Sequence, residues 1–90
     1  MRSNQDPVLL QAFAAEIKAR RAISGISQEG LAFASGVNRT FVAKLELGQT
    51  SPSLTTIFRV AEGLEVQPDE LIQSTMRRYK KELRVRAKTG

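Results

Sequence analysis

The sequence predicts an all-α fold of five helices and no strands. Apolar residues recur at helical spacing along most of the 90 residues. Capping residues precede the apolar segments, and glycine or proline separates one segment from the next. A chain of this length with 41% hydrophobic residues forms one small domain with a modest core.

The first helix is expected to run from Pro7 to about Ile23. Asp6 is a favourable N-cap residue and proline is common at the first helical position, so both mark the start. Gly25 marks the end, because glycine adopts the left-handed conformation that closes a helix. The residues that recur at helical spacing in this segment are Leu10, Phe13, Ala14, Ile17 and Arg21.

Two short helices are expected next, at about 28–34 and 39–47, with a tight turn at Gly36 between them. Ser27 and Asn38 stand where these helices begin, and both residue types cap helix N-termini well. The order of helix, tight turn and helix predicts a helix-turn-helix unit. The side chains expected to face the core are Leu31, Ala32, Val37, Val42 and Leu45.

The fourth helix is expected at about 54–64. The polar segment 49–52 precedes it as a loop, and Ser53 caps it. The fifth helix begins at Pro68, and two acids in its first turn complement the helix dipole.

The fifth helix carries an apolar stripe. Ile72, Met76, Tyr79 and Leu83 follow at spacings of four, three and four residues, so the helix is expected to continue to about Val85 and project beyond the core. A stripe with no surface of its own chain to cover needs a partner, most simply a second copy of the chain. We therefore expect these four residues to form a dimer interface. The alternative is a frayed, solvated tail.

The net charge of +5 is unevenly distributed. Residues 77–90 hold seven Lys and Arg against one acid, Glu82, whereas residues 1–76 hold seven bases against eight acids. We divide the chain into an N-terminal arm (1–6), a nearly neutral helix-turn-helix domain (7–76) and a basic C-terminal extension (77–90). The charge of the whole chain is therefore no argument for a nucleic-acid partner, because it comes from the extension alone.

Composition excludes several classes of protein. The chain has no cysteine and no histidine, which excludes disulfides, a structural zinc site and a histidine-based catalytic site. No window approaches the ~18 consecutive apolar residues of a membrane-spanning helix, and no secretory signal is recognisable. We expect a cytoplasmic protein that is not an enzyme and uses no metal, cofactor or small-molecule effector.

The helix at 39–47 is expected to hide one face and to offer polar side chains on the other. Asn38, Arg39, Thr40 and Lys44 are the outward residues. Side chains of these types contact base edges and phosphates in the major groove of DNA. Sequence-specific DNA binding is therefore the leading hypothesis.

Several short motifs occur in a fixed order between Phe13 and Ile72. They are Ser27-Gln28-Glu29, Leu31-Ala32, Gly36-Val37, Glu46, Gly48, Ser51-Pro52-Ser53-Leu54 and Pro68-Asp69-Glu70-Leu71. This set resembles the Xre-type helix-turn-helix family of phage repressors and Cro proteins. The resemblance implies a five-helix, lambda-repressor-like domain in a transcriptional regulator of a bacterium or phage. It further implies a repressor role, exercised by a homodimer on pseudo-palindromic double-stranded operator DNA.

The resemblance also assigns roles within the recognition helix. Asn38, Arg39 and Thr40 match the outward positions at its start. Arg39 is expected to pair with a guanine, and Thr40 to meet a thymine methyl group or a phosphate. Lys44, one turn later, is expected to contact a phosphate more than a base. The alternative for each is a solvated surface side chain.

Backbone contacts are expected on either side of this helix. Gln28 matches the family's glutamine at the start of the second helix, which contacts the DNA backbone and supports the recognition helix. Ser27 and Gln28 stand at a helix N-terminus, where free N–H groups and the positive end of the dipole attract a phosphate. Thr50 and Ser51 match the segment that presents backbone amides to phosphate in the family. Plain capping and loop formation are the alternatives.

One matching pair has a structural role instead. In the family, an arginine late in the first helix pairs with a glutamate at the end of the recognition helix. Arg21 and Glu46 match these positions, so we expect a structural ion pair and no DNA contact from Arg21.

Two glycines depart from the family pattern. Gly30 lies within the helix at 28–34, where it costs about 1 kcal/mol relative to alanine. Gly63 comes two residues before the usual place of the glycine that ends the fourth helix. The sequence therefore leaves the end of that helix undefined.

Two other functions compete with the leading hypothesis. One is an antitoxin-like or phage-related module that binds a protein and binds DNA only secondarily. A tight protein partner without sequence preference on DNA would favour it. The other is non-specific nucleic-acid binding by the basic extension, in which removal of the extension abolishes binding.

Overall fold

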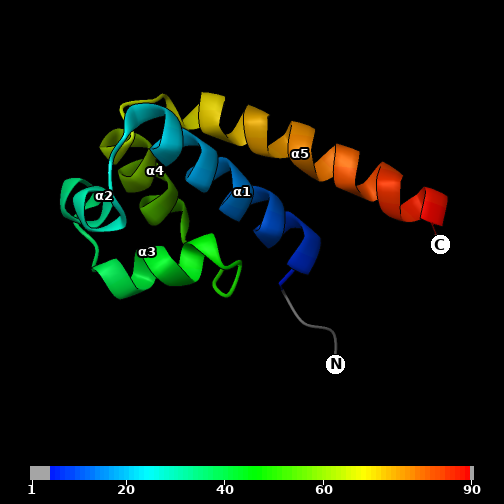
Figure 1. The fold of residues 1–90 in the computed structure, drawn as a ribbon, viewed down its shortest axis with the longest axis horizontal. Helices are drawn as coiled ribbons and strands as arrows, with labels where there is room; N and C mark the ends of the chain where they lie inside the picture. Colours follow the sequence, from blue (N-terminus) through cyan, green and yellow to red (C-terminus); the bar gives the residue numbers. More distant parts are fainter. Residues whose placement is uncertain (1–4, 90) are drawn as a thin grey trace.

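Five helices and no strand make up residues 5–89, the part of the chain that the computed structural model describes (Figure 1). They are α1 (Pro7–Ser24), α2 (Gln28–Ser35), α3 (Arg39–Glu46), α4 (Leu54–Gly63) and α5 (Pro68–Thr89). The all-α prediction is confirmed, and α1 to α4 end within one residue of the predicted positions. Most of the predicted N-terminal arm (1–6) lies outside the described residues.

All five helices share one core. The fully buried aliphatic side chains include at least one from each helix: Ile17, Leu31, Val42, Leu45, Val60 and Leu71. Helices as short as α2 and α3 are marginal in isolation, so this packing is what keeps them folded. The core therefore fixes the position of the helix-turn-helix unit.

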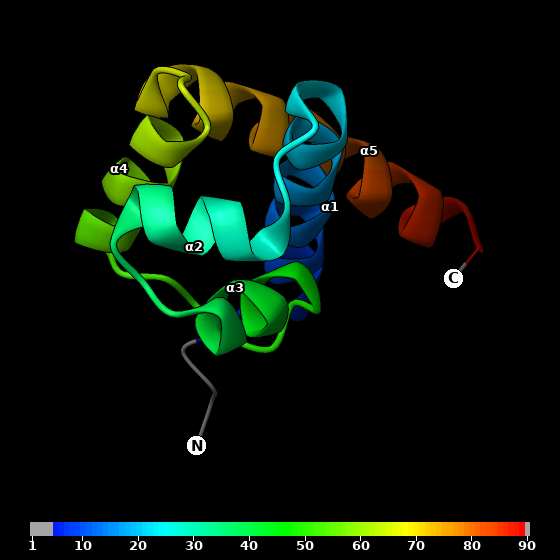
Figure 2. The same ribbon diagram turned by 60° about the vertical axis from the view of Figure 1, so that its left-hand side comes forward.

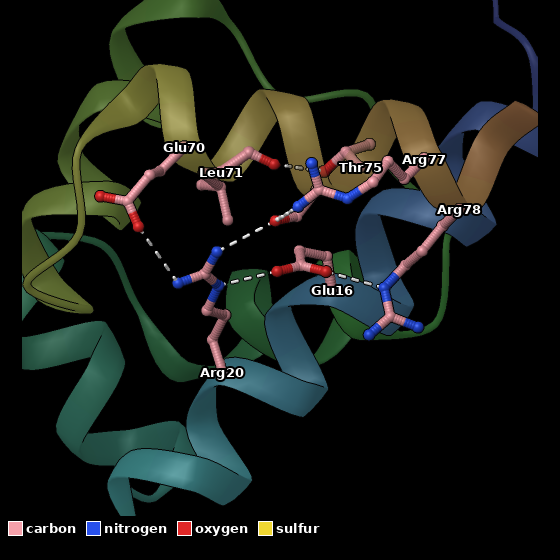
Figure 3. A network of polar contacts seen from close by, with 8 residues as sticks. Glu16, Arg20, Glu70, Leu71, Thr75, Arg77 and Arg78 are labelled. Atoms are coloured by element: carbon pink, nitrogen blue, oxygen red, sulfur yellow. Dashed lines mark hydrogen bonds and ion pairs between the residues drawn. The ribbon is translucent and has the colours of Figure 1, made fainter.

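Helix α5 runs alongside α1, and a buried carboxylate joins them (Figures 1 and 3). Glu16 is 5% exposed and accepts hydrogen bonds from Nε of Arg20 and Nε of Arg78, each at 2.7 Å. Arg20 also donates to the hydroxyl of Ser74 on α5 at 3.1 Å. Burial raises the pKa of the Glu16 carboxyl, but the hydrogen bonds from Arg78 and Arg20 outweigh burial and hold this pKa below its ordinary value.

Helix α5 is longer than predicted. It continues without interruption from Pro68 to Thr89 instead of ending near Val85, and its second half extends past the start of α1 (Figure 1). The basic extension is thus helical as far as Thr89, and no break in the helix marks the predicted boundary after residue 76. Within residues 5–89, no helix combines the length and the apolar character that a membrane span requires.

The predicted apolar stripe of α5 is only partly without a partner. Ile72, Met76 and Leu83 are 43%, 44% and 43% exposed. Tyr79 is half-buried, and its hydroxyl donates a hydrogen bond to Oδ2 of Asp6 at 2.5 Å. The expectation that the stripe covers no surface of its own chain is therefore wrong for Tyr79, because this part of α5 lies beside the start of α1.

Close packing of α4 on α2 explains why the glycine of α4 is at position 63. A Cβ atom at Gly63 would overlap Oγ of Ser35 and lie 3.1 Å from Cδ1 of Leu31, so glycine allows α4 to approach α2 closely. The left-handed turn that follows the helix is made by Glu65, whose φ is 58°. Position 65 is the customary place of the glycine in the family that the sequence resembles.

Candidate nucleic-acid interface

A tight turn joins α2 to α3, and the two helices lie next to each other (Figure 2). Gly36 closes α2 with a φ of 71°, and the N–H of Val37 returns to the carbonyl of Ala32 at 3.0 Å. The half-buried Val37 side chain then packs against the core. Backbone geometry and one apolar side chain therefore set the direction in which α3 leaves the turn.

Helix α3 is buried on one side and exposed on the other. Val42 and Leu45 are fully buried, whereas Arg39, Thr40 and Lys44 are exposed. Among the described residues, no hydrogen bond or ion pair engages these three exposed side chains. The structure thus brings two positive charges and a hydroxyl, all from predicted recognition residues, onto one open face.

Two of the predicted contact residues act as helix caps. Oγ of Ser27 accepts the N–H of Gly30 at 2.9 Å, and Oδ1 of Asn38 accepts the N–H of Phe41 at 2.7 Å. Both residues remain exposed. The hydroxyl hydrogen of Ser27 and the amide nitrogen of Asn38 are not used by these caps and can donate to a ligand.

Arg21 and Glu46 meet where α1, α2 and α3 come together. Nε of Arg21 donates to Oε2 of Glu46 at 2.5 Å, and Nη2 donates to Oε1 at 2.9 Å. Nη1 of Arg21 also donates to the carbonyl of Ile26 at 3.0 Å. A bidentate ion pair of this kind constrains orientation as well as distance, so it fixes the end of α3 against α1.

The side chain of Gln28 belongs to the same cluster, which the sequence analysis missed. Its amide nitrogen donates to Oε1 of Glu46 at 2.9 Å. This bond links the start of α2 to the end of α3, in keeping with the expected support of the recognition helix, and the expected DNA contact of Gln28 stays a prediction. No local sequence signal predicts a pair of residues that lie 18 positions apart.

The surroundings of Glu46 stabilise the charged form of its carboxyl. Burial raises the pKa of its carboxyl, but hydrogen bonds from Arg21 and Gln28 and the positive charges of Arg21 and Lys18 together hold this pKa below its ordinary value. Glu46 is therefore ionised at neutral pH. Lys18 had no predicted role, although its place one turn before Arg21 on α1 is a signal that it shares this environment.

Thr50 and Ser51 lie in the loop that leaves the C-terminal end of α3. Thr50 is half-buried and Ser51 is exposed. The amide of Gln11 on α1 donates to the carbonyl of Leu47 at 3.0 Å, which ties the beginning of this loop to α1. The eight residues of α3, about 12 Å of helix, separate Arg39 from the start of this loop along the chain.

Comparison with known proteins identifies the same unit. Residues 17–71 match the helix-turn-helix family. Control protein C.BamHI of Bacillus amyloliquefaciens is 38% identical over 56 residues, which are 62% of this chain and 69% of that protein.

Solved structures are similar in fold as well as in sequence. The restriction-modification controller protein C.AhdI from Aeromonas hydrophila has a TM-score of 0.67 and 40% identity, over 69% of this chain and 94% of that chain. The controller protein C.Esp1396I, solved as a tetramer in complex with its natural 35 base-pair operator, has a TM-score of 0.74 and 25% identity. That similarity covers 79% of this chain and 93% of the other.

The matched region takes in α2, the turn and α3, together with the Arg21–Glu46 pair that orients them. This chain belongs to the helix-turn-helix family of DNA-binding transcription regulators.

Proposed function

We propose that this chain is a sequence-specific transcriptional regulator of the restriction-modification controller type. It binds a pseudo-palindromic operator as a homodimer in the cytoplasm and acts as a repressor. The observation that carries the proposal is the exposed face of α3, where Arg39, Thr40 and Lys44 have no partner among the described residues. The similarity to a controller protein solved on its operator supports DNA as the ligand.

Each exposed side chain has a distinct part in this proposal. Arg39 donates two hydrogen bonds to a guanine, a contact worth about 1–3 kcal/mol of discrimination between bases. Lys44 contacts a phosphate and adds affinity without sequence preference. Backbone N–H groups at the start of α2 hold a second phosphate. In a homodimer these contacts repeat in two half-sites about 10 base pairs apart.

Selection from a random duplex library tests this function. The wild type, Arg39→Ala and Arg59→Ala are selected in parallel at fixed salt. Arg59 is an exposed arginine on α4, so its replacement removes the same charge from a helix other than α3. We expect the wild type and Arg59→Ala to enrich one palindrome, and Arg39→Ala to lose preference at one symmetric position. No enrichment by the wild type, or equal loss in both variants, contradicts the proposal.

A further inference from the structure

Helix α5 presents a line of cations along one face. Arg77, Lys81, Arg84 and Lys88 follow at spacings of four, three and four residues, which keeps them on one side of the helix. All four are exposed. At 1.5 Å per residue the line is about 17 Å long. These four residues are called the basic stripe below.

The charge of the basic stripe is not neutralised within the chain. The neighbouring Arg78 is paired with the buried Glu16. In contrast, among the described residues no ion pair involves any member of the basic stripe, and Arg77 donates only to the hydroxyl of Ser74, at 3.0 Å. Like charges four residues apart destabilise a helix, so the stripe carries a cost that a bound polyanion would remove.

The basic stripe is centred away from the other faces of α5, although Lys81 also borders a groove between α1 and α5. At about 100° per residue, its centre lies roughly 130° around the helix from Ile72, Met76 and Leu83, and roughly 120° from the side packed on α1. A second copy packed on the apolar residues would therefore leave the basic stripe open. Figures 1 and 2 both show the C-terminal end of α5 well apart from α3.

The chemistry of the stripe fits the phosphate backbone of DNA. A duplex carries one negative charge per 1.7 Å of its axis, so a segment as long as the stripe offers about ten charges. Favourable contact with the helix dipole accounts for cations in the last turn, such as Lys88, but not for Arg77, Lys81 and Arg84. We propose that the basic stripe binds the backbone of a DNA duplex outside the segment that α3 contacts.

This inference rests on the proposed function only for the identity of the ligand as DNA. Its test measures binding of the full chain to a long duplex of random sequence at several salt concentrations. The stripe variant is Lys81→Gln/Arg84→Gln. The control, Arg59→Gln/Lys80→Gln, removes two exposed charges from α4 and α5, outside the basic stripe, and so has the same net charge. Circular dichroism and sedimentation verify that both variants keep the helices and the oligomeric state of the wild type.

The salt dependence of the affinity for DNA distinguishes the two variants. Each phosphate contact contributes about 0.9 to the slope of log affinity against log salt, so the stripe variant should lose about 2 from this slope and bind more weakly. The control should keep the slope of the wild type. Equal slopes for the stripe variant and the control overturn the proposal. Because a random duplex contains no operator, this failure is distinct from a library selection that enriches nothing.

Two further arms identify which DNA the stripe contacts. If it contacts DNA beside the operator, neutralising the stripe weakens binding to a long duplex around the selected site more than to a duplex trimmed to that site. If it contacts a second duplex, the wild type captures a second labelled duplex and the stripe variant does not. An unchanged result for the stripe variant in both arms contradicts a DNA contact.

Discussion

At the residue scale, the end of α4 uses two different residues for close packing and for the left-handed turn. At position 63 a Cβ atom would overlap Oγ of Ser35 on α2, so glycine lets the two helices pack closely without a shift. The left-handed conformation is needed two residues later, where Glu65 adopts a φ of 58°. That conformation costs a residue with a Cβ atom roughly 1–2 kcal/mol, which the packing of the surrounding fold must offset.

We expect Glu65→Gly to raise the free energy of unfolding by up to about 1 kcal/mol, because strain is relieved while the greater entropy of unfolded glycine offsets part of the gain. The matched control is Glu62→Gly, the same change at an exposed helical position of α4, which should lower stability by about 1 kcal/mol. Urea denaturation measures both. If Glu65→Gly loses as much stability as the control, the left-handed conformation of Glu65 is not strained.

At the scale of elements, buried carboxylates hold the helices in place. Glu46 connects α3 to Arg21 on α1, and Glu16 connects α1 to Arg78 on α5. In both cases the arginines lower the pKa of a carboxyl that burial alone would raise. The ion pairs that hold α3 and α5 against α1 therefore require the carboxyls of Glu46 and Glu16 to be ionised.

This arrangement predicts a loss of stability in acid. Because the pKa of folded Glu16 lies below the ordinary value of 4.5, its contribution is complete above that pH and declines as pH falls through the lower folded pKa. We expect Glu16→Gln to be less stable than the wild type at neutral pH, with a gap that narrows toward pH ~3. Urea midpoints across this range measure the gap.

The control for this prediction is Glu62→Gln, which replaces an exposed carboxylate that has no ion pair among the described residues. It should follow the wild type at every pH. A gap between Glu16→Gln and the wild type that stays constant with pH would show that lost packing, and not lost charge, explains the variant.

At the scale of the whole molecule, an exposed apolar band continues from α4 onto α5. Leu54 and Phe58 on α4 are 72% and 54% exposed and line a groove that reaches Pro68. Ile72 follows Pro68 by one helical turn and Met76 follows by another, so the band runs from the groove along α5. A band of this kind supports association with a second copy of the chain.

Met76→Glu tests this interface. We expect it to shift the protein from dimer to monomer, because it places a charge in an apolar contact. Gln73→Glu introduces the same charge at a nearby exposed position of α5, outside the band, and should remain dimeric. Sedimentation over a range of concentrations measures both. A wild type that stays monomeric, or variants that sediment alike, excludes dimerisation through this surface.

Much of this protein follows from its sequence because the governing signals are local. Asp6, Ser27, Asn38 and Ser53 each bond to N–H groups two or three residues away, so these caps mark where α1 to α4 begin. Helical spacing likewise predicts which residues of α3 are buried and which are exposed, because a helix repeats every 3.6 residues whatever surrounds it.

Other features depend on residues that are distant along the chain. Gln28 bonds to Glu46, 18 residues away, and Tyr79 bonds to Asp6, 73 residues away, instead of standing free on the α5 stripe. These contacts exist only because packing of the core brings α2 to α3 and α5 to α1. The sequence by itself determined the helices and the exposed face of α3. Only the tertiary structure decided which polar side chains form hydrogen bonds within the fold. The reason is that such bonds depend on distances between helices and not on distances along the chain.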